Sequence, residues 1–359
     1  MADTSFQKFE PSCVNLFITN LCNRRCPFCY LNDWVTNKED DAHHMSLKSL
    51  DTYIHWLQKS RVYKVKLAGG EPMLHPNLLD FIHELKRSRI GIDAILTNGL
   101  GDTELYEKVA DLTGTNWLVN VMNPETYTKD EWELLNNNLE VLKWKNENVP
   151  VSLSGFDTSS LRRLCLSITF YRINQEYGYI IELAKRYGVP VIRYDVSRPS
   201  SNKSNIHVDF DSLMRIKPTL MDFVRDCVSE GVKPGLDDAL PYCVFTQEEL
   251  KFLYLFSNFQ SICMPVMDVM PDLTIGYCTS MRGVTPSFTL EDMTASKIFN
   301  ELLVKTEEYR NFQLARCYGC YNSDMKLCQG YCLRFKSDFL EHRKENGIKK
   351  KKRWFTLRI

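Results

Sequence analysis

Short apolar segments rich in valine, isoleucine, leucine and phenylalanine alternate with segments of helical hydrophobic period through the first two hundred residues. This alternation limits the fold more than any other feature, because strand–helix–strand units assemble almost only as parallel sheets with right-handed crossovers. Six such units are fewer than the eight that close a barrel, so we expect an open, curved sheet. The predicted strands are residues 14–20, 63–69, 92–98, 116–122, 164–170 and 189–196, and the predicted helices begin near Ser46 and cover 77–89, 102–112, 130–146 and 174–187.

The composition changes at residues 197–205, where serine, asparagine and proline replace the apolar pattern, so we expect the barrel to end near residue 196. Helical patterns follow at 209–230 and 247–257, and Pro218 should kink or split the first. From about residue 260 short strands, turns and cysteines dominate, with a hairpin closed near Pro271 and Asp272 and one helix near 291–304. The predicted fold is therefore α/β, a partial (β/α)6 TIM-like barrel with a small C-terminal α+β Cys-rich domain. The expected divisions are a core barrel at 1–200, a helical linker region at 201–259, the Cys-rich domain at 260–345 and a basic tail at 346–359.

Charge and hydropathy exclude several classes of partner. The 45 Lys and Arg residues balance 45 Asp and Glu residues, so no overall charge favours nucleic acid. The basic run 349–353 indicates a solvated tail, or else a contact for an acidic partner or RNA. The N-terminus lacks a basic region followed by an apolar run, and no segment is long and apolar enough to span a membrane. We therefore expect a cytoplasmic protein that has no membrane partner.

The 13 cysteines gather mainly in two places, which favours metal binding over disulfides in a reducing cytosol. Cys22, Cys26 and Cys29 form a CxxxCxxC pattern directly after the first predicted strand. Three buried thiols on one helix would be the simplest alternative, but Pro27 disfavours a helix at that position. Three thiolates leave one iron of a [4Fe–4S] cluster open to an outside ligand, and zinc with a fourth ligand is the competing metal.

Three motifs at successive strand ends carry a family resemblance. CNRRCPFC, with the aromatic Phe28 before its last cysteine, resembles the signature of the radical S-adenosylmethionine (SAM) superfamily. Gly69-Gly70-Glu71-Pro72 after the second strand and Thr97-Asn98-Gly99 after the third resemble two further motifs of the same family. Because the carboxyl ends of parallel strands meet at one edge, all three motifs should face the same side of the barrel.

The resemblance implies a mechanism and a set of site residues. SAM would chelate the open iron, and an electron from the cluster would break its sulfonium bond, leaving a 5′-deoxyadenosyl radical that abstracts a substrate hydrogen. Gly69, Gly70 and Glu71 would accept from the SAM ammonium, with glycine allowing close approach. Met122 stands where peptide-modifying relatives often have an aspartate. The implied SAM contacts are Phe28, Gly69, Gly70, Glu71, Asn98, Asn120, Thr169, Arg172, Arg193 and Asp195, and the last four also fit ordinary strand-end polar residues.

The C-terminal cysteines have spacings that would suit a zinc ribbon. Behind a radical SAM core, their layout resembles the SPASM and twitch extensions, which bind one or two auxiliary iron–sulfur clusters. The pattern departs from SPASM at Leu273, which replaces a glycine, in the wide gap between Cys320 and Cys328, and in the lack of a cysteine after Cys332. The resemblance implies one cluster on Cys263, Cys278 and Cys332, with Cys243 as a further candidate ligand. It implies a second cluster on Cys317, Cys320 and Cys328. The alternative is a single twitch-like cluster on Cys263, Cys278, Cys317 and Cys320. Cys13, Cys165 and Cys227 fit the core.

Relatives with this layout mostly oxidise or cross-link ribosomally made peptides, including thioether formation, so the resemblance implies a peptide substrate. A sugar or aminocyclitol that is dehydrogenated or rearranged is the alternative, and an RNA-modifying or non-catalytic cluster-binding protein is the alternative of another class. The absence of an obvious leader-binding segment before residue 14 weakens the peptide interpretation. Thr279 and Ser280 replace the catalytic aspartate that would indicate sulfatase maturation. Flavodoxin or ferredoxin is the expected electron donor.

Overall fold

The structure is a computed structural model that describes residues 11–38, 40–148, 164–263, 267–291 and 293–345. Its central feature is one sheet of nine strands in the order β7-β6-β5-β4-β3-β2-β1-β8-β9. All neighbouring pairs are parallel except β8 with β9. The outermost strands β7 and β9 do not pair, so the barrel is open. The strands are β1 (Val14–Phe17), β2 (Lys64–Ala68), β3 (Gly91–Thr97), β4 (Asn116–Asn120), β5 (Leu164–Phe170), β6 (Val191–Val196), β7 (Lys233–Leu236), β8 (Asp268–Val269) and β9 (Ile275–Gly276).

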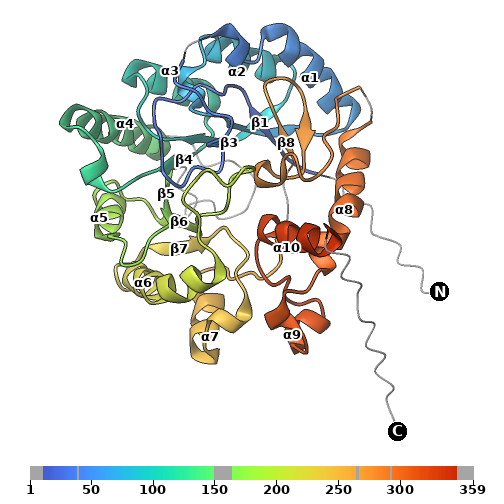
Figure 1. Cartoon of the computed structure of the whole chain (residues 1–359). Helices are drawn as coiled ribbons and strands as arrows, with labels where there is room; N and C mark the ends of the chain where they lie inside the picture. Colours follow the sequence, from blue (N-terminus) through green and yellow to red (C-terminus); the bar gives the residue numbers. More distant parts are fainter. Residues whose placement is uncertain (1–10, 39, 149–163, 264–266, 292, 346–359) are drawn as a thin grey trace, which may run out of the picture.

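Helices α1 to α6 cover the outer side of the curved sheet (Figure 1). Side-chain caps mark the start of two of these helices. The Ser46 side chain accepts a hydrogen bond from the Ser49 amide before α1, and the Asp102 side chain accepts one from the Leu105 amide before α3. The helices are α1 (Leu47–Lys59), α2 (Leu78–Arg87), α3 (Thr103–Thr113), α4 (Lys129–Asn148), α5 (Gly178–Arg186), α6 (Phe210–Ser229), α7 (Gln247–Phe256), α8 (Ala295–Asn311), α9 (Tyr321–Asp324) and α10 (Leu333–Glu345). No helix among the described residues is long and apolar enough to cross a bilayer.

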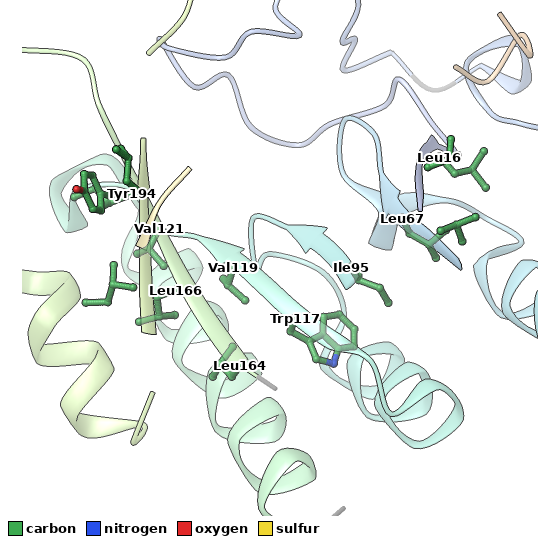
Figure 2. Packing of buried hydrophobic residues seen from close by; sticks show 14 of the residues in the cluster. Leu16, Leu67, Ile95, Trp117, Val119, Val121, Leu164, Leu166 and Tyr194 are labelled. Atoms are coloured by element: carbon green, nitrogen blue, oxygen red, sulfur yellow. The ribbon is translucent and has the colours of Figure 1, made fainter. Parts of the chain in front are cut away.

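The two faces of the sheet differ in chemistry. Alternate strand residues point outward and pack against the helices as one large apolar core, seen in Figure 2 for Leu16, Leu67 and Trp117. On the inner face, Phe17 and Ala68 join a separate small apolar cluster with Leu31 of the loop after β1. The inward positions of β6 are instead Arg193 and Asp195. The barrel interior therefore has a small apolar cluster at the ends of β1 and β2 and charged side chains on β6.

The first six predicted strands and the open barrel are confirmed, but the expected end of the barrel near residue 196 is wrong. β7 pairs in parallel with β6 and adds a seventh strand, and β8 pairs with β1. The sheet thus crosses the expected boundaries at residues 200 and 260, while the division into domains stays a prediction. Pro218 lies inside a continuous α6 and does not divide it. The hairpin near Pro271 and Asp272 is confirmed as β8 and β9. The basic tail predicted at 346–359 lies outside the described residues.

Candidate functional site

Cys22, Cys26 and Cys29 lie together in the loop that follows β1. The amide of Cys29 donates to the carbonyl of Cys26 at 3.0 Å, in a turn and not in a helix. Burial raises the pKa of Cys26 to about 11 and that of Cys29 to about 12, and the neighbouring thiols Cys22 and Cys26 add to these shifts. Crowded thiols of this kind ionise when a metal centre replaces their protons. The loop could therefore hold an inorganic cluster on three thiolates.

Gly69 and Gly70 join the end of β2 to this cysteine loop. The amide of Gly70 donates to the Thr19 carbonyl at 2.8 Å, and that of Glu71 donates to the Leu21 carbonyl at 2.7 Å. A Cβ atom on Gly70 would lie 2.2 Å from the Leu21 carbonyl oxygen, and one on Gly69 would lie 2.6 Å from that of Thr19. Side chains cannot be accommodated at those distances. The glycines are thus required by the approach of the loop backbone, a reason that the sequence alone did not provide.

The Glu71 side chain is fully buried and joins the ends of β2 and β3. One carboxylate oxygen accepts from the Met73 amide at 3.1 Å and the Thr97 hydroxyl at 2.7 Å, and the other accepts from the Asn98 amide at 2.7 Å. Burial raises the pKa of Glu71 to about 7, against the opposing effect of these hydrogen bonds. Both of its oxygens are therefore engaged within the protein.

Asn98 extends this link to the cysteine loop. Its side-chain amide donates to the Asn23 side-chain oxygen at 2.8 Å and lies 3.9 Å from the Cys22 sulfur. The Asn23 amide in turn donates to the Leu100 carbonyl at 2.7 Å. The three sequence motifs are thus bound into one unit by hydrogen bonds, as their shared edge of the barrel predicted.

Phe28, Thr169 and Arg172 line one pocket beside the cysteine loop, together with Met122 and Tyr171. The Phe28 ring lies 5.0 Å from that of Tyr171, centroid to centroid. The pocket thus combines aromatic and polar side chains next to the cysteine loop. Asn120 ends β4 in register with Ser167 of β5, and no described contact places it in this pocket.

A network of arginines and aspartates forms the charged side of the barrel interior. Arg193 contacts Asp237 and lies 3.8 Å from Asp195, while Arg198 contacts Asp238 and lies 3.8 Å from Asp237. The sequence analysis missed Arg198, Asp237 and Asp238. The paired aspartates directly follow β7, a position that would have drawn attention to them if that strand had been predicted.

The interior offers unmatched polar groups to a ligand such as SAM. Among the described residues, the Oδ1 atom of Asp195 and the Nε atom of Arg193 are buried and have no hydrogen-bond partner. Unsatisfied buried groups are costly, so a bound molecule that supplies a donor and an acceptor stabilises them. SAM carries an ammonium, hydroxyls and a carboxylate, and the residues present therefore fit it.

The C-terminal thiols fall into two groups by their electrostatic neighbours. Burial raises the pKa of Cys278, and the charges of Cys263 and Cys332 add to the shift. Burial likewise raises the pKa of Cys317, and Cys328 and Cys320 add to it. Within the described residues, no three His, Cys, Asp or Glu side chains converge closely enough to hold a single metal ion. The thiols are therefore neighbours without forming the tight arrangement of a one-ion site.

An open parallel barrel that has a three-cysteine loop at its carboxyl edge defines a class of cluster-binding α/β enzymes. Residues 16–197 match the model of the radical SAM superfamily, and the chain belongs to that family. Its cofactors are a [4Fe–4S] cluster and S-adenosylmethionine, the pair that defines the family's chemistry.

Curated relatives resemble only part of the chain. A probable GTP 3',8-cyclase of Methanocaldococcus jannaschii is 30% identical over 118 residues, which cover 32% of this chain and 39% of that protein. The tungsten-containing aldehyde ferredoxin oxidoreductase cofactor-modifying protein of Pyrococcus furiosus is 32% identical over 98 residues, 27% of either chain. This chain therefore spans less than half the length of these relatives.

Solved structures are similar over more of the chain. Streptococcus suis SuiB bound to precursor peptide SuiA has a TM-score of 0.59 at 16% identity, covering 90% of this chain and 72% of SuiB. Native anSMEcpe with bound AdoMet has a TM-score of 0.62 at 15% identity, and the match covers 94% of this chain and 98% of anSMEcpe. At these identities the likeness shows the fold, an α/β partial barrel.

Proposed function

We propose that this radical SAM enzyme modifies a ribosomally made peptide, by forming a cross-link or thioether or by oxidising a side chain. The observation that carries the proposal is the pairing of Arg193 and Arg198 with Asp195, Asp237 and Asp238 inside the barrel. Two arginines face three aspartates there, so the wall offers no excess positive charge. Such a wall suits an uncharged or cationic peptide segment better than a polyanion.

The residues near the cysteine loop have distinct roles in this proposal. Cys22, Cys26 and Cys29 hold the cluster, and the cluster and SAM together supply a 5′-deoxyadenosyl radical when both are bound. Phe28, Thr169 and Arg172 would contact SAM from the side of this pocket.

The other polar residues position the cofactor around that pocket. Asn98 fixes the loop beside Cys22, and Asp195 accepts from a cofactor hydroxyl or ammonium group. Arg193 and Asn120 would contact the cofactor or the substrate. These placements fix the substrate C–H bond near the reacting carbon, and the barrel walls exclude water from it.

The C-terminal thiols give the enzyme one or two auxiliary iron–sulfur clusters in this proposal. Such a cluster can take up the electron that a substrate radical releases when a new bond forms. Flavodoxin or ferredoxin supplies the electron for the first cluster, and the cytoplasm is the proposed location.

A nucleotide substrate is the second candidate, because two GTP 3',8-cyclases are 30% identical to this chain over 118 and 137 residues. A nucleoside triphosphate requires cations that are free to pair with phosphate oxygens. The two interior arginines already contact carboxylates, and this disfavours the nucleotide. A sugar or aminocyclitol is compatible with the wall and stays an alternative.

Anaerobic incubation of the purified protein with SAM and dithionite, followed by chromatography for 5′-deoxyadenosine, tests the reaction type. Adding a peptide encoded beside the gene, or GTP in a parallel reaction, then tests the substrate by mass spectrometry. Loss of hydrogen from the peptide is expected. Formation of a GTP-derived product with an unchanged peptide would contradict the proposal. Replacing Cys22, Cys26 and Cys29 with alanine should abolish 5′-deoxyadenosine, and Cys13→Ala is the matched control on a half-buried thiol outside the site.

A further inference from the structure

The segment 197–206, which follows β6, contacts the second half of the cysteine loop, residues 27–34. The Ile206 amide donates to the Pro27 carbonyl at 2.7 Å, and the Asn205 side-chain amide donates to the Phe28 carbonyl at 3.0 Å. Asn205 is buried, and its side-chain oxygen accepts a backbone amide of its own segment at 2.8 Å. The backbone between the second and third cysteines of the loop is therefore bound by neighbouring residues of one segment.

Asp33, which comes shortly after the last cysteine of the loop, binds the same segment with both of its carboxylate oxygens. One oxygen accepts from the Ser201 hydroxyl at 2.9 Å and from the Asn202 amide at 2.8 Å, and the other accepts from the Ser204 hydroxyl. The Trp34 indole nitrogen also donates to the Ser201 hydroxyl, at 3.1 Å. Hydrogen bonds to an ionised carboxylate are stronger than those between neutral groups, so Asp33 is the main attachment of the second half of the loop.

Arg334 on α10 reaches the segment 197–206 from the C-terminal region. Its Nε and Nη2 atoms donate to the Ser201 carbonyl at 3.2 and 2.8 Å, and its Nη1 atom donates to the Ser337 hydroxyl at 3.0 Å. Arg334 is 9% exposed, so these bonds form largely out of contact with water. Ser201 therefore joins two charged side chains, because its hydroxyl binds Asp33 of the loop and its carbonyl binds Arg334.

A second contact joins the C-terminal region to the same half of the loop. The Arg282 guanidinium lies over the Trp34 ring, 4.2 Å from the ring centroid, and a cation in this position is attracted to the face of an indole. Arg282 also donates to the Thr274 hydroxyl at 2.8 Å and lies 3.4 Å from Asp272, both in the turn between β8 and β9. Two separate parts of the C-terminal region therefore support the second half of the loop, one directly and one through the segment 197–206.

The two halves of the cysteine loop are held by different parts of the fold. Asn98 at the end of β3 binds the first half through the Asn23 side chain. The segment 197–206 binds the second half and is itself bound by α10. These two attachments share no residue. Loosening the one that involves α10 should therefore leave the one that involves β3 in place.

We propose that Arg334 is a positioning residue that holds the second half of the cysteine loop through Ser201 and Asp33. SAM binding at the barrel edge then depends on this contact from α10, because Phe28 lines the pocket beside the loop and its carbonyl is bound by the same segment. The C-terminal region thus supports the site of radical formation through contacts of its own side chains. The inference rests on the proposed role of the three loop cysteines, but not on the identity of the substrate.

Hydrogen exchange of the reconstituted full-length protein, kept anaerobic and measured by mass spectrometry, tests the contact. The reporter amides are those of Asn32 and Trp34, which donate to carbonyls of the loop at 3.1 and 2.8 Å. In Arg334→Ala their exchange should become at least about tenfold faster, the factor that corresponds to the loss of one hydrogen bond to a charged group. The Glu71 amide, which is bonded to the first half of the loop, should exchange as in wild type. Unchanged exchange at Asn32 and Trp34, or equal acceleration at Glu71, would overturn the proposal.

A double-variant cycle shows whether the effect of Arg334 runs through Asp33. Asp33→Ala alone should accelerate the same two amides, and adding Arg334→Ala to it should change their exchange less than about twofold. Two effects that multiply would show that Arg334 does not act through Asp33. Arg334→Lys keeps the charge with fewer donors and should give a smaller acceleration than Arg334→Ala, and it provides the measurement if the alanine variant folds poorly.

SAM binding gives the second readout. Titration of the dithionite-reduced protein with SAM, followed by electron paramagnetic resonance of rapidly frozen samples, yields a Kd from the change in the cluster signal. Arg334→Ala should raise this Kd by about tenfold, and Arg225→Ala, on exposed surface of α6, should leave it unchanged. An unchanged Kd in Arg334→Ala would overturn the link to SAM binding. If wild type showed no SAM-dependent signal, the proposed role of the cysteines would fail, and the exchange rates would still decide whether Arg334 holds the loop.

Discussion

The Glu71 carboxylate accepts a hydrogen bond from the backbone amide of Asn98 at 2.7 Å, and this bond links the end of β2 to the end of β3 beside Cys22. The bond has a direct consequence for the cysteine loop, because Asn98 in turn donates to Asn23 within that loop. The loop that carries the three thiols is thus held in place through a buried carboxylate at the end of the adjacent strand β2.

Replacing Glu71 with glutamine should destabilise the protein. The glutamine oxygen can still accept from Met73 and Thr97, but its NH2 group would then face the Asn98 amide, leaving two donors opposed. An unsatisfied buried donor costs about 1–3 kcal/mol, so chemical denaturation should show a loss of that order, together with less iron bound at the loop. Glu84→Gln, on exposed surface of α2, is the matched control. Equal stability of the two variants would contradict the role assigned to Glu71.

Replacing Gly70 with alanine should disrupt the same loop by a steric route. The new methyl group would lie 2.2 Å from the Leu21 carbonyl oxygen, which is backbone and cannot rotate away. A forced backbone shift costs roughly 1–3 kcal/mol or more, and the first cluster should be lost in part. Thermal unfolding and the iron content of the reconstituted protein measure both effects. Gly178→Ala serves as the control, because nothing lies within 4 Å of a Cβ atom added at that position. A Gly70→Ala protein that keeps its full iron content and an unchanged Tm would contradict the steric role assigned to Gly70.

His75 should make stability depend on pH. It is 3% exposed, and burial lowers its pKa to about 4, with Nε2 placed 3.0 Å from the Met45 carbonyl and Nδ1 accepting from the Asn77 amide. The unfolded histidine binds a proton near pH 6.5 while the folded one stays neutral, so the free energy of unfolding rises with pH between about 4 and 6.5.

Lowering the pH from 7 to 5 should therefore remove roughly 2 kcal/mol of stability through His75. Urea unfolding at both values, in wild type and in His75→Gln, isolates this contribution because the other titrating groups are shared. The variant should lose less stability than wild type over that interval. An identical loss in both proteins would show that His75 ionises in the folded state as readily as in the unfolded chain.

Asp237→Asn should change which ligands the barrel accepts. Asp237 contacts Arg193 and lies 3.8 Å from Arg198, so its neutralisation frees positive charge in the interior. We expect the variant to bind GTP or pyrophosphate more tightly than wild type by about tenfold, a gain of about 1.4 kcal/mol, measured by calorimetry. Asp222→Asn, on exposed surface of α6, is the control. Tight binding of GTP by wild type, unchanged in the variant, would favour the nucleotide alternative.

The sequence predicted the parts of the site that depend on local order. The strands β1 to β6 are rich in apolar residues, and the three motifs follow the first three of them, so their meeting at one edge could be inferred. β7 was missed because its four residues include Pro234 and Gly235, which are unfavourable in a strand interior. Without β7, Asp237 and Asp238 could not be placed beside Arg193 and Arg198.

By itself, the sequence determined the open parallel barrel, the three-thiol loop and the glycine–glutamate motif, because hydrophobic period, turn chemistry and residue spacing act over a few positions. Only the tertiary structure decided that Glu71 is engaged within the protein and that the interior arginines are paired. Those contacts join residues tens of positions apart, and their partners depend on how the whole sheet curves and where its late strands attach.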